Sequence, residues 1–447
     1  MDLIGFKRKT ELNPHQWTVI GFAVIILIGA ILLALPLAST SGKSIGFLDA
    51  LFTSTSAVCV TGLAVVDTGS AYTVFGQVVI MLLIQVGGIG FMTYGVIIAL
   101  LLGKRIGLKQ RVFIQESTKA TSIQGLIKLV LRIVIITFSV EAAGALFLWL
   151  RWIPDLGVGQ AAYYAAFHAV SAFNNAGFGL WPDNLVRYVG DPVVNIVITM
   201  LFVTGGIGFI VIMDVFKKRR WSQFSLHTKI VLLMTAILSV GGFILILVLE
   251  LLNPAVFGSL SWSEKLWAAY FQNMSTRTAG FNSVDMGGLL TATQFLMVFL
   301  MFIGASSGST GGGIKTNTFA VLLAAMYSHI RGRSQVQLFK RKIANEIVYS
   351  ALSVILISLG LVLTISFLLT ITEGGQDFIA LLFEATSAFA TVGLTLNLTP
   401  ELSSAGKLLI IFTMFAGRLG PLTLAFALAS RKRDSKIGYP EEKVLIG

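Results

Sequence analysis

Four short segments of the chain combine a central glycine with small, hydroxyl or apolar neighbours in a pattern that suits cation binding. They are Val60-Thr61-Gly62-Leu63, Asn175-Ala176-Gly177-Phe178, Thr278-Ala279-Gly280-Phe281 and Thr391-Val392-Gly393-Leu394. A bare cation that leaves water needs oxygen ligands, and a ring of backbone carbonyls can supply them. Glycine suits such a ring because it permits backbone conformations that a side chain obstructs. We call these stretches the filter segments and predict that their glycines line one cation site.

The surroundings of the filter segments repeat as well. The four glycines lie 115, 103 and 113 residues apart. An aromatic residue stands ten positions before each glycine: Phe52, Phe167, Tyr270 and Phe383. A serine stands six positions before three of them, at Ser56, Ser171 and Ser387, with Met274 at the fourth place. Self-similarity at a fixed spacing indicates a repeated structural unit, so we expect four copies of one unit.

Composition places these units in a membrane. Hydrophobic residues make up 55% of the 447 residues and charged residues only 12%, which excludes an ordinary soluble globule. The formal net charge of +12 comes from basic clusters between apolar stretches, which is typical of membrane topology rather than of a nucleic-acid partner. No spacing of His, Cys or carboxylate residues indicates a metal centre of the zinc type.

Apolar segments long enough to cross the ~30 Å of bilayer hydrocarbon occur eight times. They are predicted at 16–37, 74–102, 129–150, 193–215, 230–252, 291–326, 345–371 and 406–428. A shorter, half-apolar segment precedes each filter segment, at 45–57, 161–173, 263–276 and 376–389. These are too short to cross, so we predict an all-α integral membrane protein with eight spans and four re-entrant pore helices around one central pore. The pore helices would point their partially negative C-terminal ends at the cation.

Basic residues indicate the orientation of this fold. Of 33 Lys and Arg residues, 25 fall at the termini and the links between units, six fall on the opposite side and two within spans. Since positive residues collect in the cytoplasm, both termini are predicted to be cytoplasmic, in a multi-pass protein of the cell membrane. The expected boundaries are an N-terminus at 1–15, repeats at 16–111, 112–220, 221–333 and 334–430, and a C-terminal tail at 431–447.

The glycines also have a plain structural interpretation. Glycine is common where membrane helices approach each other closely, and for a single glycine that interpretation would be preferable. Four glycines with matching aromatic residues, half-length helices and basic links favour a filter instead.

At the same residues the chain resembles the ion-translocating subunits of the Trk/Ktr/HKT superfamily, and Thr391 to Leu394 resembles a degenerate TVGYG potassium-channel filter. The resemblance covers essentially the whole chain. It implies K+ uptake, with K+ held at Gly62, Gly177, Gly280 and Gly393. A serine in place of the first glycine marks sodium-selective plant relatives, so Gly62 favours K+. The second TVGYG glycine is replaced by Ala64, Gly179, Asn282 and Thr395, which implies looser selectivity.

The resemblance also implies partners. These are a second copy of the chain, in a homodimer, and a cytosolic ring of a KtrA-like regulatory subunit that binds ATP or ADP. The basic links would contact this ring, although attraction to anionic lipid headgroups explains their charge equally well. Whether uptake is coupled to Na+ stays open, and a less selective sodium/potassium channel is an alternative.

The sixth predicted span contains a glycine- and hydroxyl-rich stretch, 304–316. Irregular backbone at membrane depth is tolerated only against protein or a water-filled cavity. The resemblance implies an intramembrane loop that gates the filter. The expected gate residues are Gly304, Ser306, Ser307, Gly308, Gly311, Gly312, Gly313, Lys315 and, on the last span, Arg418. For the two cations, which are costly within spans, pairing with backbone carbonyls is an equal alternative.

Other residues have simpler interpretations. Arg277 is expected to brace the filter by donating to carbonyls, and His168 to pack within the second pore helix. Glu141 and Glu250 are too isolated to form a proton pathway. The motifs at 87–91, 205–209 and 417–421 are expected to be kinked or closely packed helix. A membrane enzyme that uses the serines of 304–316 would lack a base near them in sequence, so no catalytic residue is assigned.

Overall fold

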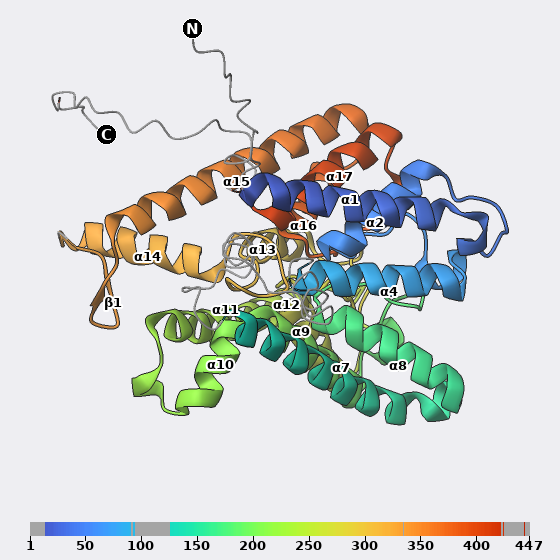
Figure 1. Ribbon diagram of the computed structural model, residues 1–447, viewed down its shortest axis with the longest axis horizontal. Coiled ribbons are helices and arrows are strands. Elements are labelled where there is room, and N and C mark those ends of the chain that lie inside the picture. Colours follow the sequence, from blue (N-terminus) through green and yellow to red (C-terminus); the bar gives the residue numbers. More distant parts are fainter. Residues whose placement is uncertain are drawn as a thin grey trace, which may run out of the picture.

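The computed structural model describes residues 14–90, 93, 126–333, 335–421, 423 and 442. Apart from one short hairpin, the regular elements of this part of the chain are helices (Figure 1). In Figure 1 the helices follow one another around the molecule from blue through green to red, and the last long helices lie beside the first. Helix α17 contacts α2, which closes the arrangement. The predicted all-α architecture is confirmed.

Each repeat begins with a long helix and continues with a short one. The long helices are α1 (Pro14–Ala34), α7 (Leu126–Leu156), α11 (Leu226–Glu250) and α15 (Asn345–Thr372). All four are long and apolar enough to cross a membrane. The short helices are α2 (Phe47–Cys59), α8 (Val158–Phe173), α12 (Trp262–Ser275) and α16 (Phe378–Ala390), close to the predicted half-length segments.

After its filter segment, each repeat continues with the helix predicted as its second span. We call it the second helix, and it is shorter than predicted. These helices are α4 (Val74–Ile89), α9 (Pro192–Ile207), α13 (Thr291–Phe302) and α17 (Ser404–Leu419). The smaller elements are α3 (Thr68–Ala71), α10 (Phe209–Lys218), α14 (Thr316–Ile330), four 3-10 turns at 36–38, 186–188, 221–223 and 399–401, and strands β1 (Gln337–Leu338) and β2 (Arg341–Lys342).

The predicted span over 193–215 is broken within the 205–209 motif, where a kink or close packing was expected. Helices α9 and α10 meet at an angle of 95°, so at most five spans can be counted among the described residues. The break lies at Gly208, whose φ of +99° no continuous helix contains, and α4 and α17 end in the same way at Gly90 and Gly420. Most of 91–102 and 422–428 lies outside the described residues.

Glycines press the second helices against the ends of the short helices. A Cβ atom built on Gly87 would lie 1.9 Å from the Val58 carbonyl oxygen of α2. The same construction puts Gly205 1.9 Å from the Phe173 oxygen and Gly417 1.8 Å from the Phe389 oxygen. No larger residue fits, since these neighbours are backbone atoms. The expected close packing of the glycine motifs is therefore confirmed, and it sets the position of the first, second and fourth filter segments.

In every repeat, a hydrogen bond also connects the chain at the end of the long first helix to the start of the second helix. The four hydrogen bonds are Thr73 Oγ1 to the Leu37 carbonyl at 2.7 Å, Arg151 Nε to Asp191 Oδ2 at 2.5 Å, Leu290 N to Glu250 Oε1 at 3.1 Å and Ser403 N to Glu373 Oε2 at 2.9 Å. We call these contacts the interhelical ties. Glu250 is thus a structural acceptor.

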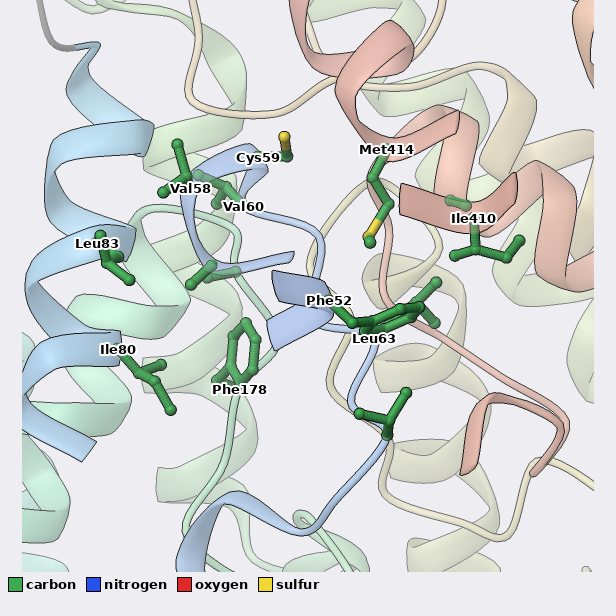
Figure 2. Packing of buried hydrophobic residues seen from close by; sticks show 14 of the residues in the cluster. Phe52, Val58, Cys59, Val60, Leu63, Ile80, Leu83, Phe178, Ile410 and Met414 are labelled. Carbon is green, nitrogen blue, oxygen red and sulfur yellow. The ribbon is translucent and has the colours of Figure 1, made fainter. Parts of the chain in front are cut away.

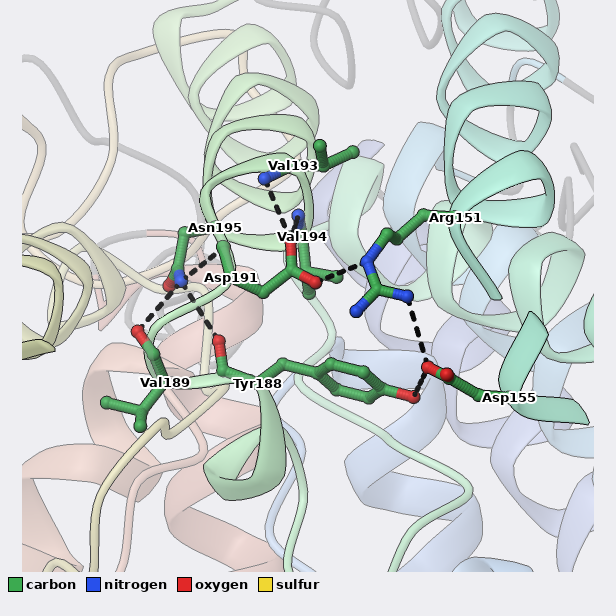
Figure 3. A network of polar contacts seen from close by, with 8 residues as sticks. All are labelled: Arg151, Asp155, Tyr188, Val189, Asp191, Val193, Val194 and Asn195. Carbon is green, nitrogen blue, oxygen red and sulfur yellow. Dashed lines mark hydrogen bonds and ion pairs between the residues drawn. The ribbon is translucent and has the colours of Figure 1, made fainter. Parts of the chain in front are cut away.

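Figure 3 shows the tie of the second repeat. Asp191 accepts from the backbone amides of Val193 and Val194 at 2.9 and 3.1 Å and so caps α9, while its other oxygen accepts from Arg151. The Arg151 guanidinium also donates to Asp155, 3.2 Å away, which accepts from the Tyr188 hydroxyl as well. One arginine therefore connects the end of α7 to the start of α9.

The core around α2 combines side chains from three repeats (Figure 2). Phe52, one of the repeated aromatic residues, is fully buried among residues that include Leu63 of its own filter segment. Phe178 of the second filter segment and Ile410 and Met414 of α17 belong to the same cluster. Burying a large apolar side chain stabilises a fold by about 1.5–3 kcal/mol in water, and packing contacts remain within a membrane. This core fixes the first two filter segments relative to each other and to α17.

Candidate functional site

Each filter segment starts at the C-terminal end of a short helix with a strained residue. Two positions before each glycine, a non-glycine residue has a positive φ: Val60 at 58°, Asn175 at 61°, Thr278 at 70° and Thr391 at 49°. Three of these four are β-branched, for which positive φ is a genuine outlier. Such strain costs about 1–3 kcal/mol per residue and concentrates at functional sites. The repeat seen in sequence is therefore a repeat of backbone geometry.

The four filter glycines form a closed ring. A Cβ atom built on each glycine would approach the carbonyl oxygen of the residue before the next repeat's glycine. The pairs are Gly62 with Ala176 at 2.4 Å, Gly177 with Ala279 at 3.0 Å, Gly280 with Val392 at 2.3 Å and Gly393 with Thr61 at 2.1 Å. Each contact runs to the next repeat, and the last returns to the first. The structure thus brings all the predicted filter residues together around one axis, where no side chain would fit on the glycines.

The amide groups of the ring point back toward the short helices. The residue before each glycine donates its N–H to a serine carbonyl: Thr61 to Ser56 at 2.8 Å, Ala176 to Ser171 at 2.8 Å, Ala279 to Ser275 at 3.0 Å and Val392 to Ser387 at 2.9 Å. These donors are therefore satisfied within each repeat. Because these backbone N–H groups are already hydrogen-bonded, the backbone groups of the filter segments that can face a cation are carbonyl oxygens.

Two of the repeated serines also support the glycines directly. Ser56 Oγ accepts from the Gly62 amide at 3.0 Å, and Ser387 Oγ accepts from the Gly393 amide at 3.1 Å. In the third repeat, Ser275 Oγ donates to the Phe281 carbonyl at 2.5 Å. In sequence, Ser56 and Ser387 served only to align the repeats, and their spacing of six before the glycine is the signal that identifies the support. Ser275 stands five positions before Gly280, so that signal does not find it.

The loop between α13 and α14 packs against three of the four filter segments. Gly311 adjoins Thr278, since a Cβ on Gly311 would lie 2.2 Å from the Thr278 hydroxyl. Gly312 approaches Thr391 in the same way, at 2.3 Å. Thr310 Oγ1 lies 3.1 Å from the Asn175 side-chain amide. The loop runs from Ile303 to Lys315, nearly the predicted range, and it contacts the strained residues that begin the filter segments.

The broken second helix of repeat two holds this loop. The amides of Ser306 and Thr310 donate to the carbonyls of Gly206 and Gly205 at 3.0 and 3.2 Å. In return, the Phe209 amide donates to the Gly308 carbonyl at 3.1 Å. The break at Gly208 frees the backbone groups that these bonds use. Sequence reasoning missed this attachment because about 100 residues separate the two segments.

Both intramembrane cations contact carbonyls of the loop. Lys315 Nζ donates to the Gly311 and Gly312 carbonyls at 2.6 and 3.2 Å. Arg418 donates to the Thr310 carbonyl of the loop and, at 3.1 Å, to the Gly88 carbonyl of α4. The carbonyl pairing considered for these residues is present. Arg418 joins the loop to two other repeats.

A cavity of about 350 Å³ lies against the loop and the broken helices. Its lining includes Gly90, Gly308, Ser309, Lys315, Arg418 and Gly420. Gly311 lines this cavity and also packs on Thr278 of the third filter segment. The loop therefore separates the glycine ring from the cavity at this point.

Two other predicted residues have different surroundings. Arg277 does not brace a filter carbonyl in the described contacts, because its guanidinium donates to Thr235 Oγ1 on α11 at 3.3 Å. The hydrogen bond observed for this side chain therefore goes to the first helix of its repeat instead of to the filter. His168 is a packing residue, as expected: Nδ1 lies 2.8 Å from the Tyr164 carbonyl, and the Leu180 amide donates to Nε2.

Glu141 is buried within a small polar cluster. Its carboxylate accepts from Gln85 Nε2 of α4 at 3.1 Å and from Asn174 Nδ2 at 3.0 Å. Asn174 directly precedes the second filter segment. The carboxylate therefore connects α7 to the base of the ring.

Comparison with known proteins agrees with this geometry. Residues 11–436 match the family model TrkH, described as a cation transport protein. The chain is 50% identical to the Ktr system potassium uptake protein B of Bacillus subtilis, with 98% of each chain covered. It is 38% identical to the potassium/sodium uptake protein NtpJ of Enterococcus hirae over the full length of both. The crystal structure of the potassium transporter TrkH from Vibrio parahaemolyticus shares the fold, with a TM-score of 0.74 at 18% identity, over 95% of this chain and 87% of that one.

The family match covers nearly the whole chain, and so do the matches to these relatives. They confirm the resemblance to the Trk/Ktr/HKT superfamily and the prediction that the chain is not an enzyme. The chain belongs to the TrkH family of cation transport proteins.

Proposed function

We propose that the chain carries K+ across the cell membrane through the ring formed by Gly62, Gly177, Gly280 and Gly393. The closed contact of each glycine with the next repeat's carbonyl is the observation that supports this function. Relatives named as potassium uptake proteins support K+ as the ion. A dehydrated K+ would exchange water for carbonyl oxygens of the filter segments, and the C-terminal ends of four helices would favour its positive charge.

A second candidate function is less selective transport of K+ and Na+, or K+ uptake coupled to Na+. The relative named as a potassium/sodium uptake protein favours it. The filter segments have one ring glycine each, so few coordination layers discriminate between the ions. Gly62 favours K+ instead, because it gives the first filter segment the same residue, without a side chain, that the other three segments have at this position.

The loop 304–316 acts as the gate in this proposal. It packs under three filter segments and is held by Lys315 and Arg418. Positive charges next to a cation path oppose flow by simple repulsion. Opening requires the loop to leave the filter segments and Arg418 to release the Thr310 carbonyl.

A cytosolic ring of nucleotide-binding subunits would bias this loop, and two copies of the chain would share such a ring. A partner can shift a two-state element only by contacting its two states differently. ATP or ADP would bind to the partner and not to this chain. Both termini would lie in the cytoplasm, and reporter fusions active only when outside the cell would contradict that orientation.

The function is tested by reconstituting the purified chain in vesicles and measuring K+ flux with and without Na+. Growth rescue of a potassium-uptake-deficient bacterium at low K+ gives a second readout. Flux of K+ that is independent of Na+ supports a channel-like path, and flux that requires Na+ supports coupling. No rescue and no flux from folded protein would reject the proposal.

A further inference from the structure

Two links of the chain, distant in sequence, form one basic surface at the end of the molecule that carries the β-hairpin (Figure 1). One link runs from the end of α10 into the start of α11, and the other connects α14 to α15. Residues 214–229 and 331–346 together contain ten Lys and Arg residues against two acidic ones, Asp214 and Glu346. Asp214 already pairs with Lys218 at 2.7 Å. At most two of the ten charges can therefore be neutralised within the links.

Aromatic contacts hold the two links together. The rings of Trp221 and Phe339 meet edge to face with centroids 6.3 Å apart, and Trp221 also contacts Phe224 at 6.0 Å. Below them, Leu226 and Leu338 pack against one buried cluster. The basic residues of both links are thus fixed on one surface. We call the exposed side chains Phe216, Arg219, Arg220, Trp221, Phe339, Lys340, Arg341 and Lys342 the basic–aromatic patch.

The aromatic members of this patch remain accessible. Phe216 is 74% exposed, Trp221 48% and Phe339 40%, although each is large and apolar. Exposed aromatic rings beside Lys and Arg are typical of segments that lie at the boundary between lipid headgroups and acyl chains. The rings enter the apolar boundary while the cations remain at the level of the phosphates.

The angle between α9 and α10 orients the patch relative to the membrane. Helix α10 runs at 95° to α9. Since α9 is an apolar helix of 16 residues from the spanning part of repeat two, a helix perpendicular to it lies along the membrane plane. Phe216, Lys217 and Lys218 close α10, and Arg219 and Arg220 follow. The break at Gly208 therefore directs this basic segment along the membrane surface.

We propose that the basic–aromatic patch binds anionic phospholipid headgroups of the adjoining leaflet. The phosphate oxygens would accept from the Arg219, Arg220 and hairpin cations, and Trp221, Phe216 and Phe339 would lie at the acyl boundary. Each Lys or Arg near such a surface contributes about 1 kcal/mol, and added salt screens the attraction. This binding is separate from ion transport and does not depend on the filter.

The test compares lipid retention by purified protein. The chain is exchanged from mixed phosphatidylcholine and phosphatidylglycerol vesicles into detergent, and bound lipid is counted by native mass spectrometry. We expect the wild type to retain phosphatidylglycerol preferentially. The hairpin variant Lys340→Gln, Arg341→Gln, Lys342→Gln is expected to lose about fivefold of this preference for each charge removed. The variant Arg219→Gln, Arg220→Gln should change in the same direction.

The control variant Lys43→Gln, Lys265→Gln removes two charges that lie outside the patch, one in the link that follows α1 and one in the first turn of α12. It should leave the preference unchanged. Equal preference in the wild type and both patch variants, or equal loss in the control, would overturn the proposal. So would patch variants that keep their lipid preference but no longer co-elute with the nucleotide-binding subunit, because the patch would then be a protein-docking surface.

Discussion

Gly393 stands against Thr61, the residue before the first filter glycine, although more than 300 positions separate them. A Cβ atom on Gly393 would lie 2.1 Å from the Thr61 carbonyl oxygen. This contact joins the last repeat to the first and closes the ring. The site therefore requires all four repeats to be in place, because each glycine depends on a carbonyl from the next.

The first prediction concerns Gly62. Replacing Gly62 with Ser puts a Cβ 2.4 Å from the Ala176 carbonyl, at a φ of +94°. We expect the ring to deform locally and the preference for K+ over Na+ to fall by about tenfold, the effect of ~1.4 kcal/mol. The measurement is the Na+ to K+ uptake ratio at equal protein level.

Gly46→Ser provides the matched control for Gly62→Ser. Gly46 has the same φ of +94°, but nothing lies within 4 Å of its Cβ position. Its substitution should leave the uptake ratio unchanged. An unchanged ratio in Gly62→Ser as well would remove Gly62 from the selectivity site.

The second prediction concerns the support of the ring. Replacing Ser56 with Ala leaves the amide of the half-buried Gly62 without its acceptor, a loss of about 1 kcal/mol. We expect weaker K+ binding, measured as a raised half-saturation concentration for uptake. Ser171→Ala is the control, because the buried Ser171 hydroxyl has no hydrogen-bond partner among the described residues. Equal effects of the two substitutions would show that the hydroxyl of Ser56 does not matter.

The third prediction separates two roles of Arg418. Arg418→Gln removes charge-assisted hydrogen bonds to Thr310 and to α4, each worth about 1.5–3 kcal/mol. We expect a loosened loop and K+ flux raised roughly tenfold without the regulatory subunit. Arg418→Lys keeps the charge but loses the planar fork, so an intermediate flux is expected. A folded Arg418→Gln protein with wild-type flux would show that the arginine is only a structural pairing.

The fourth prediction concerns the loop itself. Deleting Gly311 and Gly312 removes the residues that pack on Thr278 and Thr391. We expect higher K+ flux into vesicles without the regulatory subunit, and no response to its nucleotide. Deleting Gly374 and Gly375, which contact nothing within 4 Å of their Cβ positions, is the control. A loop-deleted protein that stays closed and still responds to ATP would place the gate elsewhere.

Sequence predicted the features of the fold that recur locally. The filter glycines, the short helices and the aromatic residues before them stand at fixed offsets within each repeat, so one pattern identified all of them. The break between α9 and α10 lies in the glycine motif at 205–209, where a kink or close packing was expected, but hydropathy alone does not give the positive φ of Gly208 or a bend of 95°. The contacts of the loop with Gly205 and Gly206, and of Arg277 with Thr235, depend on how repeats pack against each other, which no local pattern contains.

The covalent joining of the four units has a consequence for how selectivity can evolve. In a pore assembled from four identical chains, one mutation changes every quarter of the ring at once. Here a mutation at Gly62, Gly177, Gly280 or Gly393 changes one quarter and leaves three carbonyl contacts intact. Ion preference can therefore shift in small steps through single substitutions, each of which natural selection can retain or discard separately.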